Sequence, residues 1–170
     1  MNINNINVNK YPISQILDPE SKTIYEIPKY QREYIWGTKQ WEELFNDLME
    51  NGAGYFLGSI ICINTTQDTL NNPKFEVVDG QQRLTTLSLL LAALYVTLDS
   101  NRDSLDEDQQ SDILQLKRKL VIKKTQSEIR IVPQVQHKNH EDYMGLLADK
   151  KIIAPHQTPK FAGNRRIFQG

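Results

Sequence analysis

The 170-residue sequence contains very little cysteine and histidine, with one of the former and three of the latter. The single cysteine, Cys62, excludes an internal disulfide and any zinc cluster built on several cysteines. Because it lies in an apolar run, we expect it to be buried, and a lone thiol fits a reducing compartment. Three histidines and one cysteine also give no basis for a Ser-His-Asp or Cys-His catalytic arrangement.

Long apolar runs and an excess of one charge are missing as well. The longest apolar run, residues 87–98, is interrupted by Ser88 and Thr97 and is too short to span a bilayer. Residues 1–6 lack the charged and apolar regions of a signal peptide, so we expect a cytoplasmic protein. With 20 Lys and Arg against 21 Asp and Glu, the net charge of −1 argues against strong non-specific binding of nucleic acid.

The length is that of about one domain with a substantial core. We expect a loosely ordered N-terminus over residues 1–10, one domain over 11–150, and the start of a truncated C-terminal region over 151–170. Helices are predicted over residues 13–17, 39–50 with Thr38 as N-cap, 80–99, 111–120 and 139–149, and strands over 23–27, 55–63, 75–79 and 128–132. The segment 55–63 is apolar on both alternating faces, which is typical of a central strand. These elements predict an α+β fold with a small mixed sheet packed with helices.

The most informative segment lies where a predicted strand turns into the longest predicted helix. It reads Asp79-Gly80-Gln81-Gln82-Arg83-Leu84-Thr85-Thr86-Leu87. In a structural interpretation, Asp79 caps the helix, Gln82 completes a capping-box variant and Gly80 eases the turn. In a functional interpretation, the free N–H groups and partial positive charge of a helix N-terminus bind an anion or nucleotide. The structural interpretation leaves Gln81 and Arg83 without a role, and both interpretations stay open.

A second unusual cluster connects a predicted strand to the helix predicted over residues 39–50. It reads Ile27-Pro28-Lys29-Tyr30-Gln31-Arg32-Glu33-Tyr34-Ile35-Trp36. Tyr30 or Tyr34 could stack on a base, and Arg32 could pair with phosphate in a forked geometry. Alternatively, Tyr34 and Trp36 anchor the following helix by hydrophobic contact. We favour the anchor for Trp36, and a functional role for Gln31 and Arg32.

Three further patterns give weaker signals. The glycine-rich residues 52–59 lack the P-loop lysine and precede a strand, which excludes a Walker-type site. Within them, Gly58 is expected to mark the close approach of a neighbouring backbone or a ligand. His137 and His140 could share a helix face but lack partners for a metal site. The basic run at residues 117–119 indicates a solvated helix face or a nucleic-acid edge.

The segments 27–36, 55–60 and 79–87, in this order and spacing, resemble the N-terminal domain family of GmrSD-type restriction proteins. The resemblance covers roughly residues 11–100, and residues 130–147 fit more loosely. It implies a ParB/sulfiredoxin-like core and a nucleotide-binding or NTP-hydrolysing sensor domain of a bacterial protein that restricts phage or foreign DNA, often modified DNA. It also implies a separate HNH-type nuclease domain in the complete protein. Because this chain lacks that domain, we expect no nuclease activity from it.

By motif position, the resemblance implies that two sets of residues form a nucleotide site. The catalytic set is Asp79, Gln82 and Arg83, and the nucleotide-binding set is Tyr30, Gln31, Arg32, Gly80 and Gln81. In physical terms, the arginines would neutralise phosphate oxygens and the glutamines would donate hydrogen bonds. The aspartate would hold the turn or a Mg²⁺ ion, since alone it would repel a phosphate. The expected cofactor is an NTP of unknown base, with Mg²⁺ as a candidate and no metal site formed by the protein alone.

Two rival functions would use the same residues. One is a non-enzymatic, ParB-like DNA-binding or protein-docking module whose arginines contact DNA phosphate. The other is a structural partner in which the motif only caps a helix. The expected partners are a nucleotide, DNA through the complete protein, and the missing nuclease domain. Homo-oligomerisation is left open, and no membrane partner is expected.

Overall fold

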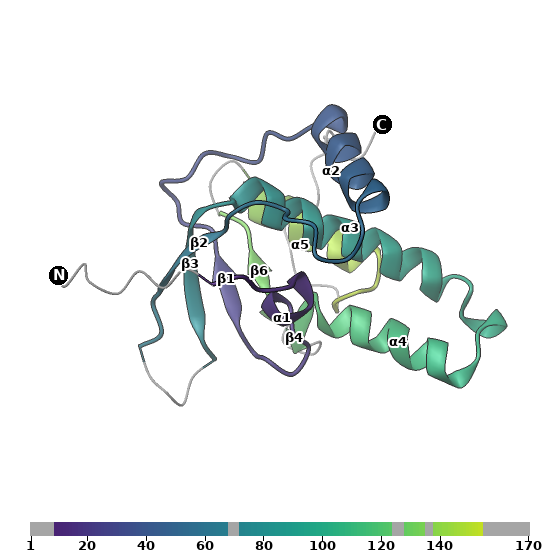
Figure 1. Cartoon of the computed structure of the whole chain (residues 1–170). Coiled ribbons are helices and arrows are strands. Elements are labelled where there is room, and N and C mark those ends of the chain that lie inside the picture. Colours follow the sequence, from purple (N-terminus) through teal and green to yellow (C-terminus); the bar gives the residue numbers. More distant parts are fainter. Residues whose placement is uncertain (1–8, 68–71, 124–127, 135–137, 155–170) are drawn as a thin grey trace.

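The computed structural model describes residues 9–67, 72–123, 128–134 and 138–154. The helices are α1 (Ile13–Ile16), α2 (Thr38–Glu50), α3 (Gln81–Asp99), the 3₁₀ turn η1 (Arg102–Ser104), α4 (Glu107–Arg118) and α5 (Asn139–Asp149). The strands are β1 (Ile24–Glu26), β2 (Ile61–Asn64), β3 (Lys74–Asp79), β4 (Val121–Lys123), β5 (Glu128–Ile129) and β6 (Ile131–Val132). Figure 1 shows the sheet at one side of the molecule, α3 and α5 beside it, α2 at the top, and α4 extending away.

The main sheet is mixed and has the strand order β2-β3-β1-β6. Strand β2 runs antiparallel to β3, whereas β1 runs parallel to both β3 and β6. The predicted α+β fold with a small mixed sheet is therefore confirmed. The single strand predicted over residues 128–132 is wrong, because Arg130 separates β5, which pairs with β4, from β6, which pairs with β1. The helix predicted from residue 111 begins earlier, at Glu107.

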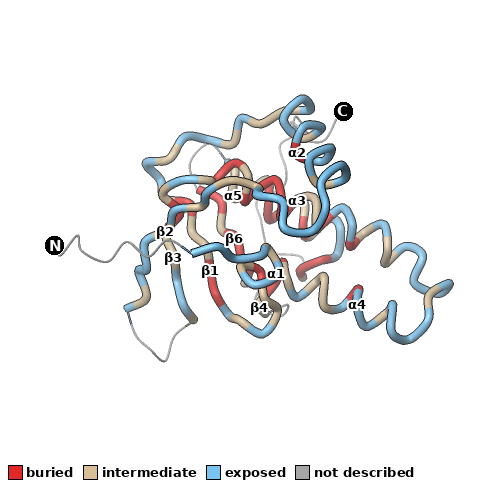
Figure 2. Tube along the Cα trace, in the orientation of Figure 1, coloured by how far each residue is buried: buried red, intermediate tan, exposed pale blue. Residues whose placement is uncertain are grey.

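Helix α3 is the central element because it contributes to both hydrophobic clusters of the core. Near its start, Leu84 is fully buried against a cluster that includes Val77 of β3 and Ile131 of β6. Further along, Ala92 and Tyr95 pack in a second cluster with residues of α4 and α5. Figure 2 shows this helix buried along much of its length. A helix that packs on several sides is apolar nearly all round, which explains the dense leucines in its sequence.

Strand β2 differs from its prediction in length and in position. It contains only residues 61–64 and lies at the edge of the sheet, so the predicted central strand over residues 55–63 is wrong. Tyr55, Phe56 and Ile63 are exposed, and Cys62 is half-buried, not fully buried as expected. Burial raises the pKa of the Cys62 thiol to about 11, so it is protonated at neutral pH. An apolar run in the sequence does not reveal whether the fold covers it.

Helix α2 begins one residue earlier than predicted, and its N-cap is Gly37, so the assignment of that role to Thr38 is wrong. The Gln40 side chain accepts the Gly37 N–H at 2.9 Å, which satisfies one unpaired donor at the helix start. Only Leu44 of this helix is buried, whereas Phe45 and Met49 are exposed.

A chain of hydrogen bonds joins α2 to α3. Trp41 Nε1 donates to the Tyr34 hydroxyl at 2.6 Å, and the Thr86 hydroxyl donates to the carbonyl of Gln82 at 2.8 Å. Because the Thr86 proton is used in that bond, the Tyr34 hydroxyl donates to Thr86 Oγ1, 2.7 Å away. Burial raises the pKa of Tyr34, and the bond that its hydroxyl accepts from Trp41 partly opposes this shift. Tyr34 thus connects α2 to α3 through its hydroxyl group.

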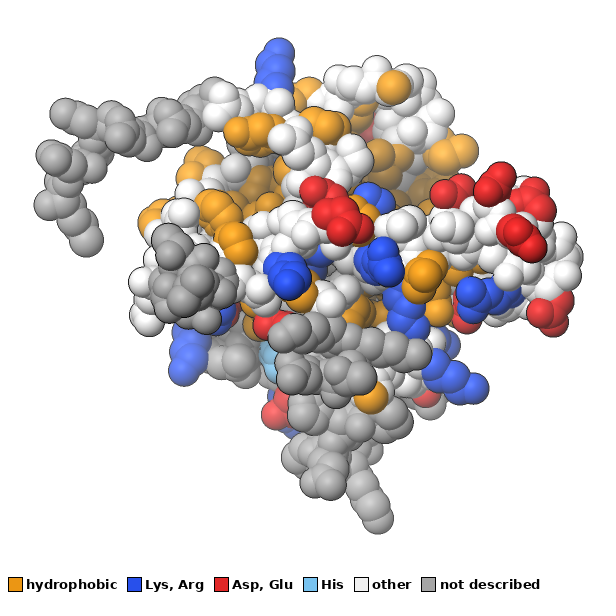
Figure 3. Space-filling model, turned by 90° about the horizontal axis from the view of Figure 1, so that it is seen from below, with side chains coloured by type: hydrophobic (Ala, Val, Ile, Leu, Met, Phe, Trp, Pro, Cys, Tyr) orange, Lys and Arg blue, Asp and Glu red, His pale blue; other side chains and the backbone are white. Residues whose placement is uncertain are grey.

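The charged surface is divided between the two signs. In the view of Figure 3, Asp and Glu side chains gather at the end of the molecule formed by η1 and the start of α4, and Lys and Arg lie nearer the centre. This face therefore carries no uniform basic field of the kind that binds nucleic acid non-specifically. Among the helices that the structure describes, none combines the length and apolar character needed to cross a bilayer.

Candidate functional site

The turn from β3 into α3 is built on a glycine. Gly80 is the N-cap of α3 and has a φ of 87°, in the left-handed region that favours glycine. A Cβ at this position would lie 2.8 Å from the carbonyl oxygen of Ser59, so the backbone of residues 59–60 packs directly on the turn. No side chain caps the helix, so the capping box predicted from Asp79 and Gln82 is wrong. The left-handed turn brings a neighbouring backbone to the position where a capping side chain would lie.

The side chain of Gln82 is used to hold the loop of residues 33–36. Its Nε2 donates to the carbonyl of Glu33 at 2.9 Å. Its Oε1 accepts the N–H groups of Ile35 at 2.9 Å and Trp36 at 3.3 Å. Gln82 is only 5% exposed, so these bonds form where water does not compete well. The predicted catalytic residue Gln82 therefore positions the motif segment 27–36 against α3.

Three glutamines far apart in the sequence form a second connection, with Gln31 at its centre. Gln81 Nε2 donates to Gln31 Oε1 at 3.2 Å, and Gln31 Nε2 donates to the carbonyl of Val78 at 2.7 Å. Gln134 Nε2 in turn donates to the Gln31 carbonyl at 3.0 Å. The first turn of α3, the end of β3 and the segment before α5 are thereby joined through one residue. The structure brings the predicted site residues Gln31 and Gln81 into direct contact.

The guanidinium of Arg83 lies on the segment that precedes β2. Its Nη1 donates to the carbonyl of Ser59 at 3.2 Å. Gly58 has a φ of 103°, and a Cβ there would lie 2.6 Å from Arg83 Cζ. The predicted close approach at Gly58 is confirmed, but the neighbour is the Arg83 side chain and not the backbone or ligand that was predicted.

We expect Gly58→Ala to lower the free energy of unfolding by about 1–3 kcal/mol, because alanine is strained at this φ and displaces Arg83. Urea denaturation measures the change. Gly54→Ala is the matched control, since Gly54 has a φ of 95° but no atom within 4 Å of an added Cβ. The fall in the free energy of unfolding of Gly54→Ala reports backbone strain alone. Equal losses in the two variants would show that the contact with Arg83 contributes nothing.

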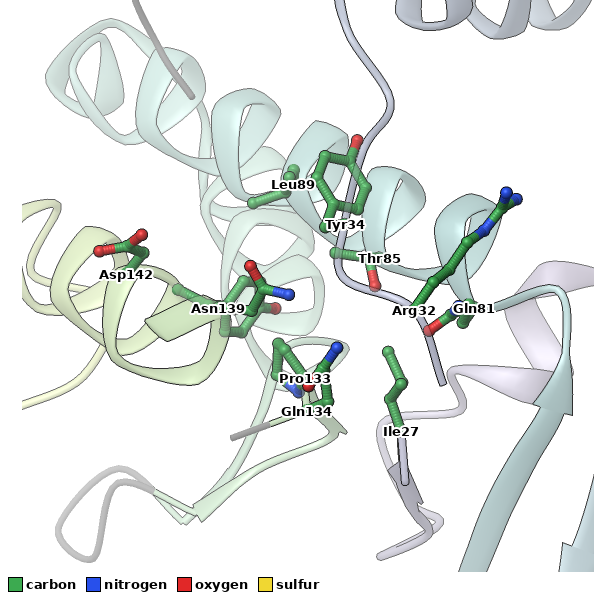
Figure 4. Close-up of a pocket in the computed structure, with 11 residues that line it drawn as sticks. Ile27, Arg32, Tyr34, Gln81, Thr85, Leu89, Pro133, Gln134, Asn139 and Asp142 are labelled. Atoms are coloured by element: carbon green, nitrogen blue, oxygen red, sulfur yellow. The ribbon is translucent and has the colours of Figure 1, made fainter. Parts of the chain in front are cut away.

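A hollow lies between the 27–34 loop, one face of α3 and the start of α5, and we call it the central hollow. Its wall consists of Ile27, Arg32, Tyr34, Gln81, Thr85, Leu89, Pro133, Gln134, Asn139, Asp142 and Tyr143. In Figure 4, Arg32 and Gln81 lie at one end and Asp142 at the other, with Gln134 and Asn139 between them. Residues of the first and third motif segments therefore face one space.

The remaining predicted site residues do not line the central hollow. Asp79 is exposed at the end of β3, and Gly80 and Arg83 face residues 58–60. Tyr30 is 69% exposed and its hydroxyl donates to Glu76 Oε1 at 2.6 Å, a bond that is the main cause of its raised pKa. Of the predicted site residues, the structure thus places Arg32 and Gln81 at the hollow and the others outside it.

The far wall of the hollow contains polar residues that the sequence patterns did not single out. Gln134 is buried, and Asn139 and Asp142 follow one turn apart at the start of α5. Burial is the main cause of the raised pKa of Asp142, and the charge of Lys138 partly opposes it. In the sequence, the only signal for Gln134 was that it closely follows the apolar segment that forms β6. Of the two histidines considered for a metal site, His137 lies outside the described residues, and the described part of the chain contains no group of three or more metal-ligating side chains.

Comparison with protein families gives a match over nearly the whole chain. Residues 13–167 match the model described as the GmrSD restriction endonuclease, N-terminal domain. The match includes all three motif segments and extends well beyond the residues 11–100 over which the resemblance was expected. No curated protein matches the chain.

Proposed function

This chain belongs to the family of GmrSD restriction endonuclease N-terminal domains, and on that basis we propose that it binds a nucleoside triphosphate as the sensor domain of a restriction protein. The observation that carries the proposal is the central hollow, whose wall joins Arg32 of one motif segment to Gln81 of another. Motif residues that only stabilise the fold have no need to share a cavity. Ligand sites are typically concave and mainly apolar, with a few convergent polar groups.

The charges at one end of the hollow suit a phosphate group. Arg32 is exposed beside Gln81, which is the first residue of α3. A helix N-terminus carries a partial positive charge and favours an anion, and a guanidinium can donate two parallel hydrogen bonds to phosphate oxygens. Arg83, two residues further along α3, uses one of its five N–H donors on Ser59 and faces residues 58–60, outside the hollow.

Binding is proposed ahead of hydrolysis, because the amide of Gln82 is already bonded to the 33–36 loop. Gln82 is therefore assigned a positioning role, and the hydrolytic roles of Asp79 and Arg83 stay predictions. Phosphate release measured with each NTP in the presence of Mg²⁺ tests hydrolysis separately.

Thermal denaturation with ATP, GTP, CTP and UTP, each with and without Mg²⁺, tests the proposal. A ligand at 100 times its Kd stabilises the fold by about 2.7 kcal/mol, a readily measured rise in Tm. We expect such a rise with at least one NTP, and we expect Arg32→Ala to reduce it strongly.

The matched control is Arg102→Ala, since Arg102 is a partly exposed arginine of η1 that pairs with Asp99 and does not line the hollow. It should leave the ligand-induced rise unchanged. A folded protein whose Tm no NTP raises would contradict the proposal. If it then bound DNA with a steep salt dependence that Arg32→Ala or Arg83→Ala removed, the docking module would be the better function.

A further inference from the structure

Strand β2 forms one edge of the main sheet, and that edge lacks the usual protection against pairing. Within the described residues β2 pairs only with β3, in antiparallel orientation. Natural edge strands commonly carry charged side chains, proline or a bulge that prevents pairing with another chain. Residues 55–67 contain no charge and no proline, and the irregularity between the two strands is an extra residue in β3, Val78. The outer edge of β2 is therefore open to a further strand.

The register of the two strands shows which backbone groups point to that edge. The N–H of Thr65 donates to the carbonyl of Lys74 at 2.9 Å, so the backbone of Thr65 faces β3. In an antiparallel ladder, successive residues turn their N–H and C=O groups to opposite sides. The backbone of Ile63 therefore also faces β3, whereas the N–H and C=O groups of Cys62 and Asn64 point outward. Two residues of β2 thus each present a donor and an acceptor at the edge.

The side chains of β2 divide between a core face and an open face of the sheet. Cys62 packs against the hydrophobic cluster that includes Val77, so Ile61 and Ile63 point to the opposite face. Both isoleucines are 54% exposed. Single exposed apolar residues are normal, but two isoleucines on the same face of an uncharged edge strand form a surface that suits an apolar partner strand.

The absence of charge along the strand indicates which partner fits this edge. In a symmetric dimer the same patch meets itself, so any charge on it would lie near a like charge. An antiparallel pair centred on Cys62 places Ile61 opposite Ile63 of the second copy, and both lie on the open face of the sheet. The same register joins the outward-pointing backbone groups of Cys62 to those of its copy, and the groups of Asn64 to those of Ile60. The edge of β2 is therefore complementary to itself in both its hydrogen bonds and its side chains.

We propose that β2 pairs with β2 of a second copy of this chain, antiparallel about a two-fold axis at Cys62, so that the two main sheets become continuous. The contact is small, because each chain contributes one strand of four residues. Small contacts are weak and reversible, so the Kd of the dimer is on the order of 100 μM. The dimer is independent of nucleotide binding, and failure of either proposal leaves the other intact.

Sedimentation velocity at protein concentrations between about 10 μM and 1 mM tests the proposal. We expect the chain to shift from monomer to dimer over this range, and the double variant Ile61→Lys, Ile63→Lys to raise the Kd by about tenfold or more, because like charges then meet across the axis. Both positions are more than half exposed, so the variant should fold. Met49→Lys is the matched control, since Met49 is a 70% exposed apolar residue of α2, and it should leave the Kd within about twofold. A monomer at every concentration, or a dimer that only Met49→Lys weakens, would overturn the proposal.

Amide hydrogen exchange of the original protein, followed by NMR at low and high protein concentration, avoids any effect of a substitution on folding. The dimer predicts that protection of the Cys62 and Asn64 amides rises with concentration, whereas protection of the Ile63 amide, which faces β3, stays constant. Protection at Cys62 and Asn64 that does not change with concentration would overturn the proposal. If those amides were already protected in a monomer, a different segment would occupy the edge, and the second copy would be excluded.

Discussion

Gln82→Met is expected to lower the free energy of unfolding by about 3 kcal/mol and to expose the 33–36 loop to proteases. The substitution preserves side-chain size but removes three hydrogen bonds, at 2.9, 2.9 and 3.3 Å, from a residue that is 5% exposed. Leaving buried backbone donors and acceptors unpaired costs about 1–3 kcal/mol for each group that water cannot reach. Urea denaturation gives the free energy, and limited proteolysis followed by mass spectrometry locates the released segment.

Gln40→Met is the matched control for Gln82→Met. Gln40 is an exposed glutamine whose side chain accepts one backbone N–H, that of Gly37, at 2.9 Å. Its replacement should cost no more than about 1 kcal/mol, because water can solvate the exposed donor. Similar losses in the two variants would contradict the role of Gln82 as the residue that holds the loop. If Gln82→Met also weakens NTP binding, tripolyphosphate binding should weaken with it, because Arg32 belongs to the same segment.

Arg130→Ala is expected to cost about 3–5 kcal/mol of stability, the largest loss predicted for this domain. Arg130 lies between β5 and β6 and is 1% exposed. Its Nη1 donates to the carbonyls of Ser21 at 2.6 Å and Thr23 at 3.2 Å, and its Nη2 donates to the carbonyl of Arg118 at 3.2 Å. Burial lowers its pKa from the usual value. One side chain thus connects the segment before β1, the end of α4 and the sheet.

Arg130→Lys separates charge from geometry in this prediction. A lysine keeps the positive charge but replaces the forked guanidinium by a single ammonium group, so it cannot reach three carbonyls in the same arrangement. We expect it to recover less than half of the stability that Arg130→Ala loses, as measured by urea denaturation. Full recovery would show that the charge alone matters. Arg118→Ala is a control for a partly exposed arginine, whose pairing with Glu20 at 3.7 Å should contribute less than about 1 kcal/mol.

Elements with a clear helical period were predicted well from the sequence. The helix predicted over residues 139–149 has the same bounds in the structure. The helix predicted over residues 80–99 begins one residue later than predicted, at Gln81. The longer of the two carries leucines at positions 84, 87, 91, 94 and 98, a helical spacing over several turns that is a strong local signal. The segment 55–63 was only apolar on both alternating faces, and the structure leaves Tyr55 and Phe56 exposed there. Whether these side chains are exposed depends on which surfaces the rest of the fold covers, and the residues of the segment do not contain that information.

The candidate site was predicted in part. Arg32 and Gln81 do face one hollow, and Gln31 contacts Gln81. Gln134 was missed because it is separated from Gln31 by 103 positions and belongs to no motif. Of the two interpretations left open for Asp79, the helix cap is wrong, because Gly80 takes the N-cap position of α3 in a left-handed conformation.

The sequence by itself determined the family, the α+β class, the main helices and the need for glycine at the turn before α3. These follow from local patterns, because periodicity and backbone conformation depend on residues close together in the chain. Only the tertiary structure decided what the glutamines of the motifs do. An amide can donate to or accept from almost any polar group, so its role depends on which distant backbone the fold brings within about 3 Å. Gln82 holds a loop, Gln31 joins three segments, and Gln134 donates to the carbonyl of Gln31.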